Sequence, residues 1–144
     1  MQDRPGMMSV VRARGVLAAA GVELFTGDLF DALPGGTFDL IFCAGVTNGL
    51  SRDRNVALYQ AVQPSLAPGG RFVIQSFMRD QHQMAALFGV QMFLGGNGGD
   101  AHPETSYRAW LAEAGFGQVD MVDVEVGRRT LLFAATEASA ARPG

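Results

Sequence analysis

Two polar residues follow two short apolar runs, and their side chains suit ligand recognition. Asp28 comes just after the run at residues 22–26, and Asn48 comes after the run at 38–43. A short acidic side chain accepts hydrogen bonds, whereas an asparagine amide both donates and accepts them. Open α/β sheets bind ligands in the crevice outside the carboxyl ends of their parallel strands. If both runs are parallel strands of one sheet, Asp28 and Asn48 line one crevice.

Histidine, cysteine and isolated carboxylates are the other candidates for chemistry. His82 and His102 are the only histidines, and either could act as a base, although a lone histidine in a loop or at a helix start is more often solvated or capping. Glu104 and Glu113 show no paired spacing of metal ligands, so no metal site is expected. The single cysteine, Cys43, is expected to be a small buried apolar group rather than a nucleophile.

Short apolar runs alternate with segments of helical periodicity, which predicts an α/β fold. A helix between the runs at 38–43 and 71–77 implies parallel strands with a right-handed crossover. Gly127-Arg128 suits the turn of a closing antiparallel hairpin, and Pro64 should loosen the helix that contains it. The predicted strands cover residues 22–26, 38–43, 71–77, 118–126 and 129–135, and the predicted helices cover residues 7–20, 51–66, 81–94 and 103–114.

Composition limits the classes of protein that this chain can belong to. Its 144 residues are 48% apolar, which favours one globular domain; we place it at residues 1–136, with a frayed tail at 137–144. The net charge of −3 and the scattered arginines do not favour nucleic-acid binding. No apolar run approaches the ~20 residues of a membrane span, and the first residues do not resemble a secretory signal. We therefore expect a cytoplasmic protein without a membrane anchor.

Five motifs occur in a fixed order and carry a family resemblance. They are Gly27-Asp28-Leu29-Phe30 with Leu33-Pro34, Phe38-Asp39-Leu40-Ile41, Leu66-Ala67-Pro68-Gly69-Gly70-Arg71, Gly98-Gly99-Asp100, and Tyr107-Arg108-Ala109-Trp110-Leu111 running into Ala114-Gly115-Phe116. With the order of the elements, they resemble the C-terminal part of a class I S-adenosylmethionine-dependent methyltransferase. Within that class, the chain looks like the small-molecule O-methyltransferases of the hydroxyindole and caffeate type.

The resemblance implies a role for several residues near the cofactor. Asp28 would accept a hydrogen bond from the adenine amino group, with Leu29 packing beside the ring, and Asp3 would bind the ribose hydroxyls. An equally weighted alternative is that Asp28 only caps its own turn. Asn48 stands where the family has its catalytic base, normally a histidine, but an asparagine cannot take up a proton at neutral pH.

The acceptor pocket would be built from the Asn48 turn and the segment that follows the third predicted strand. The resemblance places Met84, Phe88, Met92 and His102 there, although methionines and phenylalanines on a helix are more often core. The glycine cluster at 95–100 trails a helix and has no lysine after it, so we expect a loop rather than a phosphate cradle.

The resemblance also implies a Rossmann-like fold that is truncated at its N-terminus. In the family sheet order 3-2-1-4-5-7-6, the first two strands would be missing, between the strands at 22–26 and 38–43. The strand at 38–43 would then have an unpaired edge. We expect the two strands to pair directly, or the edge to bind another chain as a homo-oligomer or a complementing chain.

The resemblance predicts methyl transfer from S-adenosylmethionine to a small-molecule acceptor, with O-methylation in secondary metabolism expected. The alternative is a non-catalytic remnant or interaction module that has lost cofactor binding, because the glycine-rich cofactor motif and the catalytic histidine are absent. A Rossmann dehydrogenase is the weaker alternative, since no G-x-G-x-x-G follows a strand.

Overall fold

The computed structural model describes residues 1–81, 83–95, 98–125 and 129–136. His82, the predicted hairpin link at 127–128 and the predicted tail at 137–144 lie outside the described residues. Contacts between residues divide the chain into two compact units, Met1–Gly36 and Thr37–Gly144. Among the described helices, none has the length and apolarity needed to cross a membrane.

The first unit is a small helix pair with a two-stranded parallel sheet. It contains β1 (Gln2–Asp3), α1 (Pro5–Arg14), α2 (Val16–Ala19) and β2 (Phe25–Thr26). The helix predicted at 7–20 is interrupted because Gly15 adopts a left-handed φ of 66°, a conformation that glycine tolerates and that ends α1. Gln2 and Asp3, for which no strand was predicted, pair with Phe25 and Thr26. The strand predicted at 22–26 is shorter in the structure, because only its last two residues, Phe25 and Thr26, pair with another strand.

The second unit is a four-stranded sheet in the order β3-β4-β6-β5. Strands β3 (Phe38–Ala44) and β4 (Leu66–Ser76) are parallel, as predicted, and β6 (Arg129–Thr136) is antiparallel to both β4 and β5 (Phe116–Glu125). The predicted α/β class and the closing antiparallel hairpin are confirmed. The direct pairing expected between residues 22–26 and 38–43 stays a prediction, because the two strands belong to different units.

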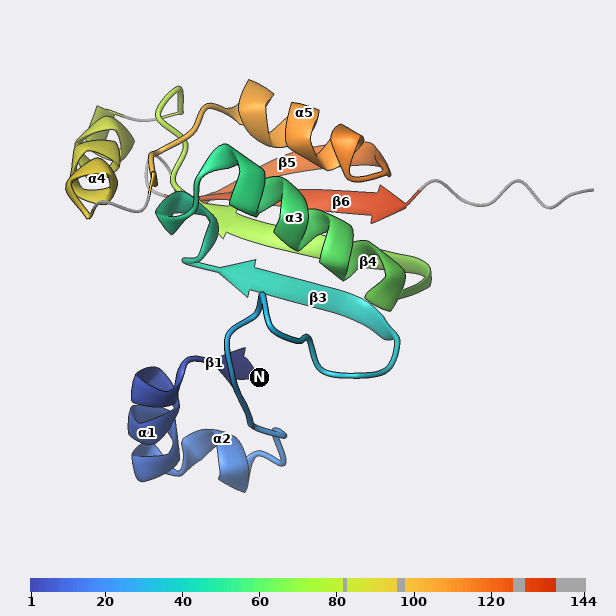
Figure 1. Cartoon of the computed structure of the whole chain (residues 1–144). Coiled ribbons are helices and arrows are strands. Elements are labelled where there is room, and N and C mark those ends of the chain that lie inside the picture. The colour runs from blue at the N-terminus through green and yellow to red at the C-terminus, as the bar shows by residue number, and fades with distance from the viewer. Residues whose placement is uncertain (82, 96–97, 126–128, 137–144) are drawn as a thin grey trace, which may run out of the picture. The chain divides into compact units, whose positions relative to one another are not determined.

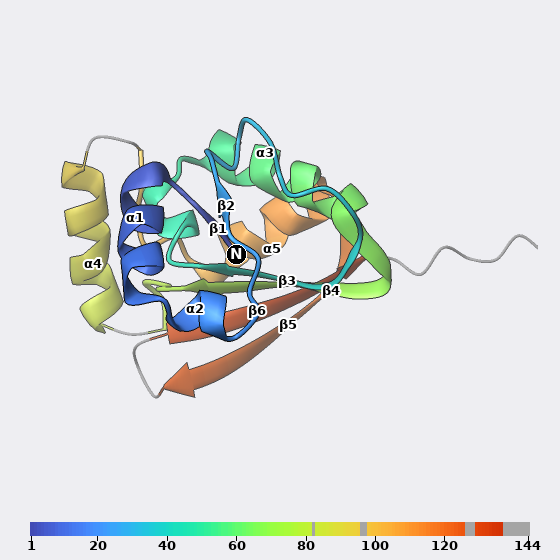
Figure 2. The same ribbon diagram turned by 90° about the horizontal axis from the view of Figure 1, so that it is seen from below.

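Among the described residues, three α-helices belong to this unit. They are α3 (Arg52–Val62), α4 (Gln83–Leu94) and α5 (Glu104–Glu113). Ser51 caps α3 by accepting a hydrogen bond from the Arg54 N–H, and Pro64 ends the helix in a 3-10 turn, η2 (Gln63–Ser65), where the sequence predicted loosening. Helices α3 and α5 lie on the same side of the sheet (Figure 1 and Figure 2).

The core fills the space between the sheet and these two helices. The ring of Phe72 on β4 packs edge-on against Tyr59 of α3, with centroids 5.6 Å apart. The side chains at this interface are fully buried, namely Tyr59, Phe72, Ile74, Tyr107, Leu111, Leu132 and Ala134. On the opposite face of the sheet, large apolar side chains of β3 and β5 are about half exposed, namely Leu40, Phe42 and Val122. Only one face of this sheet is therefore covered by α3 and α5.

Candidate functional site

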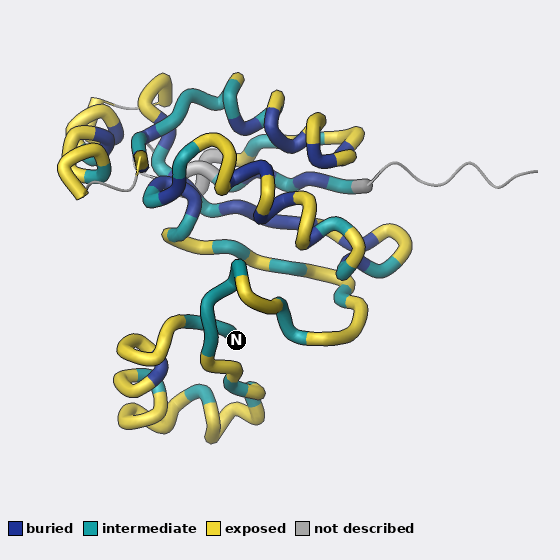
Figure 3. The backbone as a smooth tube through the Cα atoms, viewed as in Figure 1, coloured by how far each residue is buried: buried dark blue, intermediate teal, exposed yellow. Residues whose placement is uncertain are grey.

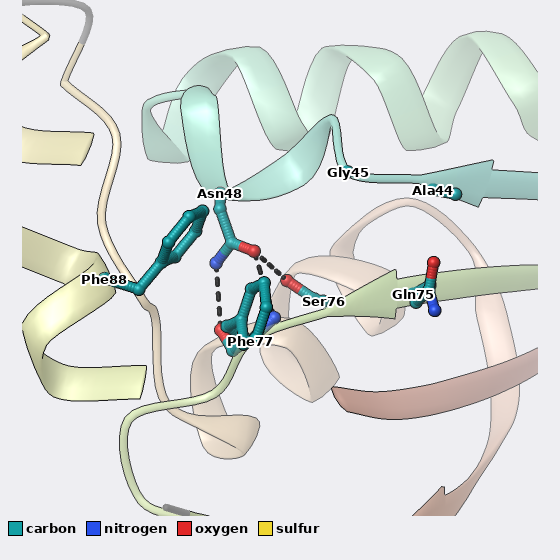
Figure 4. Close-up of a pocket in the computed structure, with 7 residues that line it drawn as sticks. All are labelled: Ala44, Gly45, Asn48, Gln75, Ser76, Phe77 and Phe88. Carbon is teal, nitrogen blue, oxygen red and sulfur yellow. Dashed lines mark hydrogen bonds between the residues drawn. The ribbon is translucent and has the colours of Figure 1, made fainter. Parts of the chain in front are cut away.

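A buried asparagine connects the ends of two parallel strands in the second unit. Asn48 lies in a short 3-10 turn, η1 (Thr47–Gly49), just after β3, and only 3% of it is exposed. Its Nδ2 donates to the carbonyl oxygens of Phe77 (2.9 Å) and Asp100 (3.0 Å). Its Oδ1 accepts from the N–H of Phe77 (3.0 Å) and the hydroxyl of Ser76 (2.9 Å), as Figure 4 shows in part. Both polar atoms of the amide are thus bonded within the protein.

Three hydroxyl groups extend this contact into a buried polar cluster. The Tyr107 hydroxyl of α5 lies 2.6 Å from the Ser76 hydroxyl, and both lie within hydrogen-bonding distance of Thr47. Burial raises the pKa of Tyr107 to about 12, so its hydroxyl is neutral at physiological pH. Among the described residues, every buried side-chain nitrogen and oxygen has a hydrogen-bond partner. We call Thr47, Asn48, Ser76 and Tyr107 the Asn48 cluster.

The loop before α5 is fastened to the same turn. The Asp100 N–H donates to the Asn48 carbonyl oxygen (2.9 Å), while the Asn48 amide donates back to the Asp100 carbonyl oxygen. Gly99 makes this approach possible, because a Cβ at that position would collide with the Asn48 carbonyl oxygen. The predicted glycine-rich loop therefore serves close backbone packing at Gly99; residues 96–97 lie outside the described part of the chain.

A pocket of about 200 Å³ opens beside the Asn48 cluster. It is lined by Ala44, Gly45, Asn48, Gln75, Ser76, Phe77 and Phe88. The Phe88 ring projects from α4 to within 4.5 Å of the Phe77 ring, measured between centroids (Figure 4). Gln75 was missed by the sequence analysis, although its place near the end of a predicted parallel strand could have indicated it. No charged side chain is among the residues that line this pocket.

Of the residues predicted for the acceptor pocket, the structure brings only Phe88 to Asn48. Met84 is 58% exposed, and Met92 is half-buried; neither lines this pocket. His102 lies elsewhere too, with Nε2 3.2 Å from the Leu50 carbonyl oxygen and its ring 4.8 Å from that of Trp110. These packing contacts fit a structural role for His102, and its catalytic role stays a prediction.

Helix α4 carries most of its large apolar side chains on an exposed side. Its buried residues are Ala85 and Gly89, and Gly89 lies close to the backbone of Ala101. The side chains that are more than half exposed are Met84, Leu87, Val90, Phe93 and Leu94. In Figure 3 most of this helix has the colour of exposed residues. The sequence analysis expected the methionines and the phenylalanine of this helix in a pocket or in the core, but the residues that the helix buries are the small Ala85 and Gly89.

The first unit contains a second, larger pocket at Asp28. Its volume is about 290 Å³, and it is lined by Gln2, Phe25, Thr26, Gly27, Asp28, Asp31, Ala32, Leu33 and Pro34. Asp28 Oδ1 accepts a hydrogen bond from the Phe30 N–H (2.9 Å), so this carboxylate does cap its own turn. An ionised carboxylate has about four acceptor sites, so one such bond is compatible with ligand binding by the same side chain.

The other predicted cofactor contacts of this unit do not line the Asp28 pocket. Asp3 Oδ1 accepts from the Arg4 N–H (2.7 Å), and Leu29 is half-buried beside the turn. Both roles stay predictions. The crevice that Asp28 and Asn48 were expected to share also stays a prediction, since the two residues belong to different units.

The remaining candidates for reactive chemistry are unreactive or scattered. Burial raises the pKa of the Cys43 thiol from its ordinary 9.0 to about 12, which agrees with a packing role rather than a nucleophilic one. Among the described side chains, no three histidine, cysteine or acidic residues group together as metal ligands would.

Solved structures of methyltransferases share this fold. PigF, solved with SAH, superposes on 94% of this chain with a TM-score of 0.82 and 20% sequence identity, over 42% of its own length. The mitomycin 7-O-methyltransferase MmcR matches 94% of this chain, over 40% of its own, with a TM-score of 0.80 and 20% identity. Human N-acetylserotonin methyltransferase in complex with SAM matches 80%, over 34% of its own, with a TM-score of 0.70 and 19% identity.

These comparisons confirm the resemblance to S-adenosylmethionine-dependent O-methyltransferases at the level of the fold. The chain spans about two-fifths of the length of PigF and MmcR. No family model matches the sequence, and no curated protein matches it.

Proposed function

We propose that this chain is part of an enzyme that transfers a methyl group from S-adenosylmethionine to a small-molecule acceptor. The observation that carries the proposal is the fold similarity to PigF, which was solved with SAH, and to the O-methyltransferase MmcR. An oxygen atom is the methyl acceptor we expect, in a reaction of secondary metabolism. The chain spans only part of those proteins, so the activity of the whole protein belongs to the proposal.

The Asp28 pocket has the chemistry that an adenosyl group needs. The Asp28 carboxylate can accept a hydrogen bond from the adenine amino group while it keeps its bond from the Phe30 N–H. Phe25, Leu33 and Pro34 supply apolar surface for a flat ring. We propose that Asp3 takes the ribose hydroxyls and that Leu29 packs beside the adenine. When bound, S-adenosylmethionine would supply an electrophilic methyl group.

The pocket beside Asn48 would position the acceptor without removing its proton. An amide cannot take up a proton at neutral pH, and both polar atoms of Asn48 are already bonded. The uncharged lining, with Phe77 and Phe88, suits an apolar or aromatic acceptor. Rate enhancement would then come mainly from alignment of donor and acceptor, with an acceptor acidic enough to ionise unaided or a base elsewhere.

Titration calorimetry with S-adenosylhomocysteine tests this proposal. We expect the wild-type chain to bind and Asp28→Ala to weaken binding at least ~10-fold, the effect of losing ~1.4 kcal/mol. Asp31→Ala is the matched control, because it removes a neighbouring carboxylate of the same pocket and should change binding less than about two-fold. No heat at millimolar ligand would contradict the proposal and favour the non-catalytic alternative.

We also propose a reducing, cytoplasmic location. The support is the single cysteine of the sequence, Cys43, which is free. Protein isolated from the native host without reductant should carry one titratable thiol per chain after denaturation. A blocked or disulfide-bonded Cys43 would contradict this.

A further inference from the structure

Gln75 is the polar side chain in the pocket beside Asn48 whose hydrogen-bonding groups the second unit does not use. The other polar side chains of that lining are Asn48 and Ser76. The Asn48 amide has two donors and two acceptor sites, and Ser76, Phe77 and Asp100 use all of them. The Ser76 hydroxyl is bonded within the Asn48 cluster as well. Among the described residues of the second unit, none forms a hydrogen bond with the Gln75 amide, and no dashed line reaches it in Figure 4. A molecule in this pocket therefore finds its side-chain hydrogen-bonding partner in Gln75.

The position of Gln75 in the sheet agrees with ligand contact. Gln75 is the next-to-last residue of β4 and pairs with Ala44, the last residue of β3. Because β3 and β4 are parallel, both residues lie at the carboxyl end of the sheet, where open α/β sheets bind ligands. Successive side chains of a strand point to opposite faces, so Gln75 lies on the face away from the fully buried Ile74. The half-buried Gln75 side chain is thus not part of the core between the sheet and its helices.

The lining favours an uncharged polar group on the bound molecule. A glutamine amide offers two N–H donors and one carbonyl acceptor, so it matches a hydroxyl, a carbonyl or another amide. The residues that line the pocket include no charged side chain. A carboxylate or an ammonium group there would lose water without gaining an opposite charge, which is costly. A charged group is therefore disfavoured beside Gln75.

Two aromatic rings form the part of the pocket towards α4. The ring centroids of Phe77 and Phe88 lie 4.5 Å apart, with an angle of 41° between the ring planes. Figure 4 shows these rings close together, with the Gln75 side chain at the opposite end of the labelled residues. Aromatic side chains contact aromatic ligands favourably, edge-on or offset. The volume of about 200 Å³ is below the ~300–1,000 Å³ of sites for drug-sized ligands, so the part of a ligand held by this unit is a small ring system.

We propose that the methyl acceptor is a small aromatic molecule with an uncharged hydroxyl or carbonyl group, and that the Gln75 amide hydrogen-bonds this group. The rings of Phe77 and Phe88 contact the aromatic part of the acceptor. This inference rests on the proposed methyl transfer, because it names the substrate class of the same pocket. Gln75 selects and orients the acceptor, and it takes up no proton, since an amide is not a base at neutral pH.

Nuclear magnetic resonance titrations of the ¹⁵N-labelled chain with phenol, toluene and benzoate test the assignment. Phenol and toluene differ by a hydroxyl in place of a methyl group, and benzoate adds a charge. Gln75→Met removes the amide and keeps an unbranched side chain. We expect this change to weaken phenol binding about 5-fold and to leave toluene binding within roughly two-fold. In the wild type, phenol should shift the Gln75 side-chain NH₂ signal, which is identified by its loss in Gln75→Met, and benzoate should bind more weakly than phenol.

Gln75→Glu separates the donor from the acceptor of the amide. An ionised carboxylate accepts hydrogen bonds but donates none. It can therefore accept from the hydroxyl of phenol, whereas acetophenone, which has only a carbonyl acceptor, loses its donor. We expect acetophenone binding to weaken about 5-fold in Gln75→Glu, with phenol affected less. Gln60→Met is the matched control, because Gln60 is an exposed glutamine of α3 outside the pocket, and it should leave all affinities within roughly two-fold. Circular dichroism shows that each variant is folded.

Four results would overturn the assignment of Gln75. They are unchanged phenol binding in Gln75→Met, equal weakening in Gln75→Met and Gln60→Met, tighter binding of benzoate than of phenol, and no binding of any aromatic probe at tens of millimolar. S-adenosylhomocysteine is titrated separately into the wild type. If it binds while any of these four results is found, the proposed function stands and the substrate class falls. If it does not bind, the proposed function falls, and the phenol titrations alone decide whether Gln75 binds aromatic hydroxyl compounds.

Discussion

Asn48 and Asp28 each follow a strand, but the structure uses the two side chains in different ways. Asn48 is buried and bonds five groups of the protein, two of them from residues in or beside α5. Asp28 is half-buried, and its carboxylate accepts a local hydrogen bond from the Phe30 N–H. A polar residue at a strand end is therefore a good ligand candidate only when its polar atoms are not already needed by the fold.

The largest effect should come from Asn48→Ala. This change removes the hydrogen bonds that Asn48 makes to the Phe77 N–H and to the Asp100 carbonyl oxygen, and the loss of a buried hydrogen-bond partner costs ~1–3 kcal/mol. We expect the free energy of unfolding, measured in urea, to fall by about 3 kcal/mol. Asp28→Ala should lower it by less than about 1 kcal/mol, because water can replace its local bond. Equal losses in the two variants would remove the distinction between these residues.

Gly99→Ala should come next. A Cβ at this position collides with the Asn48 carbonyl oxygen, so the loop must move away from the turn. Overpacking of this kind costs ~1–3 kcal/mol, and we expect about 2 kcal/mol in urea denaturation. Gly49→Ala is the control, since nothing lies within 4 Å of a Cβ there. A similar loss in both would mean that the contact between loop and turn is not tight.

Tyr107→Phe removes one hydroxyl from the Asn48 cluster and keeps the ring. The Ser76 hydroxyl loses its 2.6 Å contact but keeps the Asn48 Oδ1, so we expect a loss of about 1.5 kcal/mol. The measurement is again urea denaturation, with a double mutant cycle against Ser76→Ala. Strictly additive losses would show that the cluster does not act as a unit.

Alkaline pH should weaken the second unit by a similar amount. Burial raises the pKa of Cys43, Tyr107 and Tyr59 above the ordinary values of 9.0 for cysteine and 10.0 for tyrosine. The folded state therefore holds protons that the unfolded state releases, and stability is full below pH 9 and falls as pH rises towards 12. We expect a loss of about 2 kcal/mol at pH 10 relative to pH 8, most of it from the thiol. If the stability of Cys43→Ser does not change over this pH range, most of the loss in the wild type belongs to the Cys43 thiol.

Asp28→Asn should have the smallest effect on stability. Asparagine can form the same turn by accepting from the Phe30 N–H, so the free energy of unfolding should change by less than about 0.5 kcal/mol. The change in S-adenosylhomocysteine affinity caused by Asp28→Asn then measures what the carboxylate charge contributes to binding. A large loss of stability would show that the charge, rather than the turn, holds this segment.

Sequence patterns predicted the parts of the fold that have strong periodicity. The apolar run of β3, the helix after it and the closing hairpin were all predicted because each pattern extends over several residues. Strand β1 was missed because a strand of two residues is too short to show the alternation of apolar and polar residues that marks a strand. The break at Gly15 was missed because Val10, Val11 and Leu17 keep helical spacing across it, although a left-handed glycine interrupts the backbone.

The site was harder to predict from sequence than the fold. Asn48 was singled out by position, but its partners Ser76, Asp100 and Tyr107 lie 28, 52 and 59 residues away, so its buried bonding could not be inferred from local pattern. Met84 and Met92 were predicted to line a pocket because the family resemblance places them there, and α4 is apolar on every side. Periodicity cannot assign a face to such a helix, and the buried side proved to be that of Ala85 and Gly89.

The position of β6 in the sheet has a consequence for synthesis on the ribosome. Strand β6 is the last element of the described chain, yet it lies between β4 and β5 and buries Leu132 and Ala134 completely. Until it is made, β4 and β5 have no strand between them and the apolar side of α5 has an incomplete surface to pack on. The nascent second unit must therefore wait for one of its innermost strands, and a chaperone that shields β4 and α5 during elongation would raise the yield of folded protein.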